Sequence, residues 1–157
     1  MSKLREQIQA TYESRSTPLG FTSRSQDNDK QSFVLVLAEV SDIPAAATAV
    51  DAGVDALLYN NGQDSLPAIV EAAGEIPVGV RLTAATSDDT KQMINAGIDF
   101  LVFDVEQTEA TALLSEELGY IAILTDINTA DDDLRLLQPL ELDALLIPSS
   151  KDILSVH

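Results

Sequence analysis

A repeated phrase is the feature that most constrains the fold of this chain. Three apolar segments begin near an aspartate, and the aspartates lie at positions 55, 99 and 143, which are 44 residues apart. Ser32, Ile76 and Tyr120 keep the same interval at the start of the intervening apolar runs. Each unit therefore predicts two strands and two helices, with about 22 residues for each strand and its helix.

Six nearly continuous apolar runs predict parallel strands that are buried on both faces. They span residues 33–40, 54–60, 77–82, 98–105, 120–127 and 142–148. Helix start signals separate them, namely Ser41 or Asp42 with Pro44, Asp64 or Ser65 with Pro67, Ser87, Thr108, Thr129, and Ser149 or Ser150. Helix stop signals follow at Gly53, Gly97 and Gly119. Alternating strands and helices of this kind predict an α/β domain with a parallel sheet.

The amino-terminal part of the chain has a different pattern. Leu4, Ile8 and Tyr12 recur at every fourth position and predict an amphipathic helix over residues 2–14 that packs on the main domain. Residues 14–32 are mostly polar and predict a flexible linker. We therefore expect a helix and linker over residues 1–31 and one α/β domain over residues 32–157.

The phrase Ala-Gly-(Val/Ile)-Asp-(Ala/Phe)-Leu, at Ala52–Leu57 and Ala96–Leu101, resembles the helix-to-strand turns of (βα)8 barrels of the TIM-barrel type. It is most similar to barrels that bind phosphorylated small molecules, such as the ribulose-phosphate-binding group. The resemblance covers residues 33–148. It implies the fold more than the function, because the phrase lies at the end of the barrel that serves stability and catalysis occurs at the opposite end.

The strand count departs from that family. Six strands predict a parallel (βα)6 chain of TIM-barrel type, whereas a closed barrel needs eight. Four interpretations stay open: a truncated chain, completion by a second copy, a partner subunit that supplies strands, or an open doubly wound parallel sheet with helices on both faces. Exposed strand edges favour a homo-oligomer or a partner subunit that covers them.

Composition excludes several classes of function. A net charge of -17, from 26 acidic and 9 basic residues, makes nucleic acid and membrane surfaces poor partners, and reflects either a solvated acidic surface or an adaptation to salt. No apolar run approaches the roughly 20 residues of a membrane span, and the first residues lack a secretory pattern, so we expect a cytoplasmic protein. The chain has no cysteine, and its single histidine is the last residue, His157. A thiol nucleophile and an imidazole-based triad are therefore excluded within this chain.

Candidate site residues lie where the predicted strands end, because both candidate folds bind ligands there. Arg81 is the basic residue at a strand end, and we expect it to anchor an anionic substrate. Glu39 and Asp104 are then the candidate catalytic acid and base. The alternative is a structural ion pair of Arg81 with Asp104 or Glu39.

Further polar residues extend this candidate site. Asn60 and Thr125 also follow strands, and Ser149, Ser150 and Lys151 begin a predicted helix whose N–H groups suit a phosphate, although ordinary capping explains the serines equally well. Glu39, Asp104 and Asp126 together predict at most a weak Mg²⁺ site, and no other cofactor is indicated. The sequence thus predicts part of an enzyme for a small phosphate- or carboxylate-bearing metabolite, or a non-catalytic partial barrel that associates with itself or a partner.

Overall fold

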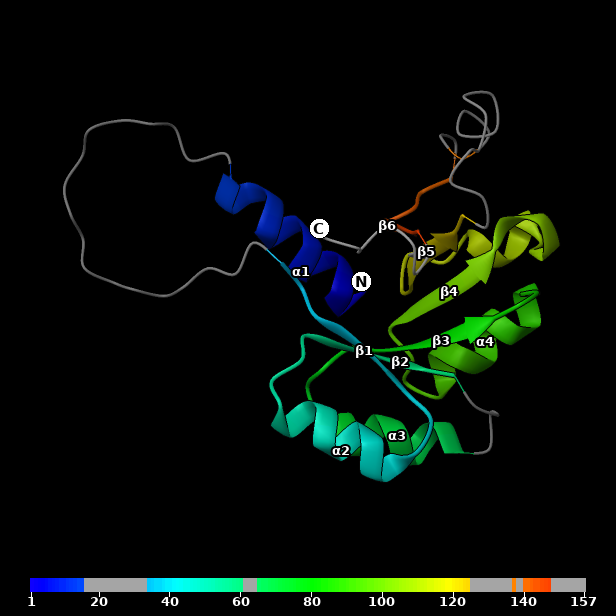
Figure 1. The fold of residues 1–157 in the computed structure, drawn as a ribbon. Helices are drawn as coiled ribbons and strands as arrows, with labels where there is room; N and C mark the ends of the chain where they lie inside the picture. Colours follow the sequence, from blue (N-terminus) through cyan, green and yellow to red (C-terminus); the bar gives the residue numbers. More distant parts are fainter. Residues whose placement is uncertain (16–33, 61–64, 125–136, 138–139, 148–157) are drawn as a thin grey trace, which may run out of the picture.

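The computed structural model alternates strands and helices along most of its length (Figure 1). It describes residues 1–15, 34–60, 65–124, 137 and 140–147. The elements in chain order are α1 (Lys3–Arg15), β1 (Leu37–Val40), α2 (Ile43–Asp51), β2 (Ala56–Tyr59), α3 (Leu66–Ala73), β3 (Val78–Leu82), α4 (Ser87–Asn95), β4 (Phe100–Asp104), the 3₁₀ helices η2 (Val105–Gln107) and η3 (Ala110–Leu113), β5 (Gly119–Ile123) and β6 (Ala144–Leu146). Within these ranges, no helix is long and apolar enough to cross a membrane.

The six strands form one curled parallel sheet in the order β1-β2-β3-β4-β5-β6. This order confirms the predicted (βα)6 chain of TIM-barrel type, in which each strand lies beside the next along the chain. The alternative of a doubly wound sheet is wrong, because such a sheet reverses its strand order at a switch point and this one does not.

The predicted starts of α2, α3 and α4 are confirmed, although Ser65 makes no side-chain capping bond and the cap of α4 is Thr86, the residue before the predicted Ser87. Asp42 accepts a hydrogen bond of 2.8 Å from the Ala45 N–H at the start of α2. Ser65 precedes α3, and Thr86 forms a capping box with Asp89 at the start of α4. Gly97 follows α4 with φ of 81°, a conformation that favours glycine and ends the helix.

The helix predicted to run from Thr108 to Gly119 is replaced by the two short 3₁₀ helices η2 and η3. The Asp104 side chain accepts a hydrogen bond of 3.0 Å from the Glu106 N–H, which starts a turn earlier than expected. The Glu109 N–H bonds the Ala85 carbonyl instead of its own segment. These contacts outside the segment override its helical pattern, and Gly119 becomes the first residue of β5.

The 44-residue interval is correct for the even strands and wrong for the odd ones. The N–H groups of Asp55, Asp99 and Asp143 bond the carbonyls of residues 36, 78 and 120, which are 42 residues apart. Ile76 is therefore two residues out of structural register with Tyr120, and Ser32 lies outside the described residues. The predicted interval of 44 and the observed interval of 42 differ by two residues. Because side chains alternate with a period of two, the predicted faces of the residues along the odd strands are unchanged.

The two faces of the sheet pack against different partners. Helices α2, α3 and α4 cover the convex face, and α1 lies on the other side (Figure 1). On the concave face, Leu4 and Ile8 of α1 pack into an apolar cluster with side chains of the strands. Its buried strand members are Ala56, Leu58, Phe100, Val102 and Ile121. The prediction that the first helix packs on the main domain is thus confirmed.

Candidate functional site

Four of the predicted site residues lie at the carboxyl ends of neighbouring strands. Glu39 is in β1, Asn60 follows β2, Arg81 is in β3 and Asp104 ends β4. Side chains alternate along a strand, and Glu39, Asn60 and Asp104 each lie an even number of residues from a concave-face side chain on their own strand. Arg81 lies one residue from Val80 and Leu82, which pack on the helix-covered face. For example, Asn60 lies two residues after Leu58. The four side chains therefore project on the concave side, as in barrels that bind ligands at this end.

Strand register sets the spacing of these groups. Leu58 is paired with Gly79 and Arg81 with Val102, so continuing the ladder by two residues sets Asn60 beside Arg81. Asp104 lies two residues beyond Val102 on β4. Neighbouring strands are about 4.8 Å apart, so the backbone at Arg81 is one strand from Asn60 and one from the strand of Asp104.

The hydrogen bonds of the four side chains differ. The amide of Asn60 donates to the carboxylate of Glu39, which holds these two exposed groups together. Asp104 is half-buried and accepts from the Glu106 N–H, so one of its oxygens caps the following turn. Arg81 is exposed, and no hydrogen bond or ion pair joins it to any other residue that the structure describes.

The structural alternative for Arg81 is therefore not formed. In the described residues, Arg81 makes no ion pair with Glu39 or Asp104, although all three project on the same side of the sheet. Within the described residues, its guanidinium donors have no side-chain acceptor.

The remaining predicted site residues lie outside the described residues. These are Thr125, Ser149, Ser150 and Lys151, together with Asp126 of the predicted Mg²⁺ site. Among residues 1–15, 34–60, 65–124, 137 and 140–147, no three acidic or histidine side chains are grouped so that they could hold a metal ion. The Mg²⁺ site stays a prediction that depends on Asp126.

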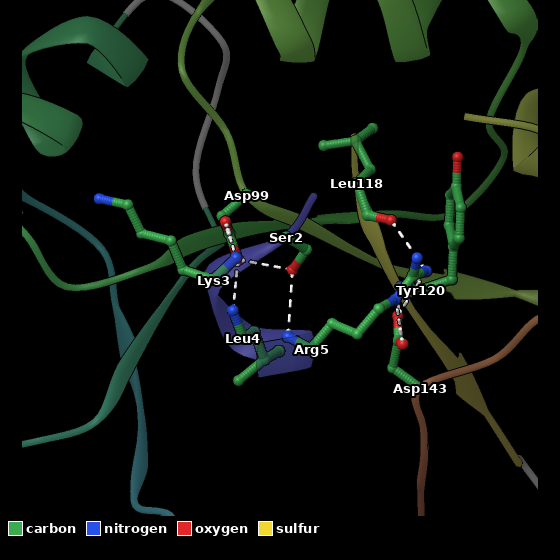
Figure 2. Close-up of polar contacts among 8 residues, drawn as sticks. All are labelled: Ser2, Lys3, Leu4, Arg5, Asp99, Leu118, Tyr120 and Asp143. Atoms are coloured by element: carbon green, nitrogen blue, oxygen red, sulfur yellow. Dashed lines mark hydrogen bonds and ion pairs between the residues drawn. The ribbon is translucent and has the colours of Figure 1, made fainter. Parts of the chain in front are cut away.

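The opposite, amino-terminal end of the sheet carries a dense polar network (Figure 2). Asp99 accepts hydrogen bonds from the Ser2 hydroxyl (2.8 Å) and from the N–H groups of Lys3 (2.7 Å) and Leu4 (2.9 Å). Asp143 accepts two bonds from Arg5, of 2.6 and 3.2 Å, and one from the Tyr120 N–H. The hydrogen bond to Asp143 raises the pKa of Arg5, and burial opposes it. This network joins α1 to β4, β5 and β6.

Sequence reasoning assigned the repeated aspartates to stability but missed their partners. The signal was present in part, because Asp99 and Asp143 are equivalent in the repeat and Arg5 is one of only nine basic residues. What periodicity cannot show is that a helix more than 90 residues away in sequence supplies the donors.

A shallow depression of about 350 Å³ lies elsewhere, between the segment from Ala110 to Glu116 and residues Leu140 and Glu141. None of the predicted site residues that the structure describes lines it. It is therefore separate from the carboxyl-end group of Glu39, Asn60, Arg81 and Asp104.

Fold and site together define an α/β chain of TIM-barrel type with six parallel strands in the described residues. No protein-family model and no curated protein matches the chain. Among solved structures it is similar to 2,3-dimethylmalate lyase, a member of the PEP mutase/isocitrate lyase superfamily, with a TM-score of 0.56 and 14% sequence identity. The alignment covers 72% of this chain and 58% of that one. This chain thus spans little more than half the length of the lyase, and the similarity shows the fold alone.

Proposed function

We propose that the chain binds a small anionic metabolite at the carboxyl ends of its strands and forms part of an enzyme that acts on it. Arg81 is the anion anchor, and Glu39 and Asp104 supply the acid and base. The observation that carries this proposal is an exposed guanidinium with no partner among the described residues, on the concave side where TIM-barrel-type proteins bind ligands.

The charge and shape of the Arg81 guanidinium indicate which ligands suit it. The whole chain carries -17, which repels anions, so a bound anion would depend on the local positive charge and hydrogen-bond donors of Arg81. Two parallel N–H donors of guanidinium match a carboxylate or a phosphate. The solved structure to which the chain is similar is named for an activity on 2,3-dimethylmalate, and a carboxylate-bearing substrate is one of the two classes that suit Arg81.

Asn60 has a positioning role in this proposal. Its amide holds the carboxylate of Glu39, and strand register sets it beside Arg81. In this proposal an anion on Arg81 has Glu39 on one side and Asp104 on the other, and these two carboxyl groups transfer protons to or from the substrate.

The test measures binding of inorganic phosphate and of malonate by calorimetry and by thermal unfolding. At ten times its dissociation constant, a bound probe stabilises the folded chain by about 1.4 kcal/mol, which raises Tm by about 3–6 °C for this size. Arg81→Leu should abolish binding and leave the melting temperature without ligand unchanged.

Lys91→Leu is the matched control, because Lys91 is an exposed cation on α4 whose ion pair with Asp88 lies away from the strand ends. It should retain binding. Equal loss in the two variants would show a general charge effect and contradict the proposal. Loss of folding in Arg81→Leu would instead assign Arg81 to the structure.

A second candidate function is association through the sheet edges. In the described part of the chain, β1 and β6 each have one strand neighbour, and exposed apolar side chains lie there: Val36 is 52% exposed, Leu145 44% and Ile147 60%. Unpaired edges of this kind invite strand pairing with another chain. Light scattering during size-exclusion chromatography measures the molar mass, and Val36→Lys with Leu145→Lys should return an assembly to the monomer. A monomer in both forms would contradict association.

A further inference from the structure

The β6 edge of the sheet is less well supported by its own strand contacts than the other strands. β6 has three residues, none of its side chains is fully buried, and among the strands that the structure describes it pairs with β5 alone. In a closed barrel the next strand would cover such an edge. In this chain the stability of the β6 edge depends on the contacts that hold Asp143, the residue directly before β6.

Arg5 of α1 joins the segments that lead into the last two strands of the sheet, β5 and β6. Its guanidinium donates to both carboxylate oxygens of Asp143, before β6, and to the carbonyl of Leu118, before β5 (Figure 2). The side chains of Arg5 and Asp143 are only 15% and 9% exposed, so the pair is shielded from water. Such bidentate, charge-assisted bonds fix geometry as well as adding energy.

The first turn of α1 is held at a second point. Asp99, just before β4, receives three donors from Ser2, Lys3 and Leu4, and a carboxylate at a helix N-terminus is favoured by the helix dipole. Ser2 is fully buried. A Cβ at Gly119 would lie 2.8 Å from the Ser2 hydroxyl oxygen, so the absence of a side chain at the start of β5 makes room for this turn.

The equivalent aspartate of the first module lacks this role. The Asp55 carboxylate accepts a hydrogen bond from the Val36 N–H within its own module, and no contact with α1 is recorded for it. By the same repeat the Asp99 carboxylate would bond the second module's odd strand, yet it accepts from Ser2, Lys3 and Leu4 at the start of α1. The chain has thus used two of its three repeated aspartates to bind one helix.

We propose that the α1 clamp, defined as Ser2, Lys3, Leu4 and Arg5 with Asp99, Leu118 and Asp143, is a conformational device that takes the place of barrel closure at the β6 edge. With α1 bound, β5 and β6 are fixed to β4 at their amino ends. With α1 released, β6 separates from the sheet while β1 to β4 keep their pairing. The β1 edge serves as the comparison for the β6 edge within the same chain. Asp99, Leu118 and Asp143 of the α1 clamp precede β4, β5 and β6, and no residue of the α1 clamp precedes β1 directly.

Amide hydrogen exchange of the full chain tests this proposal. Asp99→Ala should release the first turn of α1 and raise exchange by about tenfold or more both in residues 3–15 and in residues 142–147. Residues 37–40 should exchange as in the unsubstituted chain. Asp55→Ala is the matched control, because it removes a carboxylate that bonds Val36 instead of α1, and it should leave residues 3–15 and 142–147 protected. The proposal is overturned if residues 142–147 keep their protection while α1 loses it, or if the β1 and β6 edges lose protection equally.

A disulfide supplies the converse measurement, because the chain has no cysteine of its own. Ser2→Cys with Gly119→Cys places two thiols where the Ser2 hydroxyl and a Cβ at position 119 are 2.8 Å apart, within reach of a disulfide with its Cβ atoms about 3.5–4.5 Å apart. Added to Asp99→Ala, the oxidised pair should restore the protection of residues 142–147, and reduction should remove it.

If Asp99→Ala fails to fold, the variant with Ser2→Cys and Gly119→Cys tests the α1 clamp by itself. Slower exchange of residues 142–147 in the oxidised form than in the reduced form supports the α1 clamp. Equal exchange in the two forms overturns it.

Discussion

The two ends of the concave face treat their charged groups in opposite ways. At the amino-terminal end, Arg5, Asp99 and Asp143 are bonded to defined partners, and the side chains of Arg5 and Asp143 are largely shielded from water. At the carboxyl-terminal end, Glu39 and Arg81 are exposed, and Arg81 has no partner among the residues that the structure describes. The charged side chains at one end of the sheet are thus hydrogen-bonded to other parts of the protein, whereas those at the other end are exposed to solvent.

This difference separates stability from ligand binding. A buried charge must be paired, because removing its partner leaves a desolvated group that costs several kcal/mol. An exposed charge costs little and remains available to a ligand. Substitutions at the amino end should therefore change the free energy of unfolding, and those at the carboxyl end should change binding instead.

The largest effect is expected from Asp143→Ala. It removes the acceptor of two bonds from Arg5 and one from the Tyr120 N–H, and leaves a shielded guanidinium unpaired. We expect a loss of about 3 kcal/mol in the free energy of unfolding, measured by urea titration. Lys91→Ala breaks an exposed pair and should cost less than about 0.5 kcal/mol. Similar costs for the two variants would remove the distinction between the ends.

Gly119→Ala should have the next largest effect. Its Cβ would lie 2.8 Å from the Ser2 hydroxyl oxygen and 3.1 Å from the Phe100 Cβ, so the first turn of α1 or the strand must shift. We expect a cost of about 2 kcal/mol. Adding Ser2→Ala removes the nearest atom and should recover part of that cost in a double-mutant cycle. Additive costs would show that Ser2 is not the group that requires glycine at this position.

These contacts mark the limit of what periodicity predicts. The six apolar runs and the phrase around Asp55, Asp99 and Asp143 were enough for the strands, the α/β class and the repeat. Local signals also located α2 to α4, because a capping side chain and its helix are close in sequence. The prediction of a helix after Asp104 was wrong, because hydrogen bonds from Glu109 and Thr90 to distant carbonyls determine the conformation of that segment. The ends of the strands were predictable, but the partners of their side chains were not.

Tyr120 gives the amino-terminal end a pH dependence. Burial raises the pKa of its hydroxyl, which donates to the Ala112 carbonyl and accepts from the Ser115 N–H. The unfolded chain, with a pKa of about 10, then loses this proton first as pH rises. Stability is complete below pH 10 and falls above it by up to about 1.4 kcal/mol per pH unit. Tyr120→Phe should cost about 1 kcal/mol at neutral pH and flatten this decline in urea titrations from pH 9 to 11. If the stability of Tyr120→Phe falls between pH 9 and 11 as steeply as that of the unsubstituted chain, the pH dependence belongs to other groups.

The smallest change in stability is expected from Arg81→Leu, and it tests the comparison most directly. Arg81 and Arg5 are the same residue type on one concave face, but Arg5 bonds Asp143 and Leu118 whereas Arg81 is exposed. Urea titration should show a loss of less than about 0.5 kcal/mol for Arg81→Leu and more than about 2 kcal/mol for Arg5→Leu. If Arg81→Leu is as costly as Arg5→Leu, then Arg81 is structural and the carboxyl end is not a binding site. If it is silent in stability and binding of phosphate and malonate is lost, the free donors of this arginine are explained by its ligand.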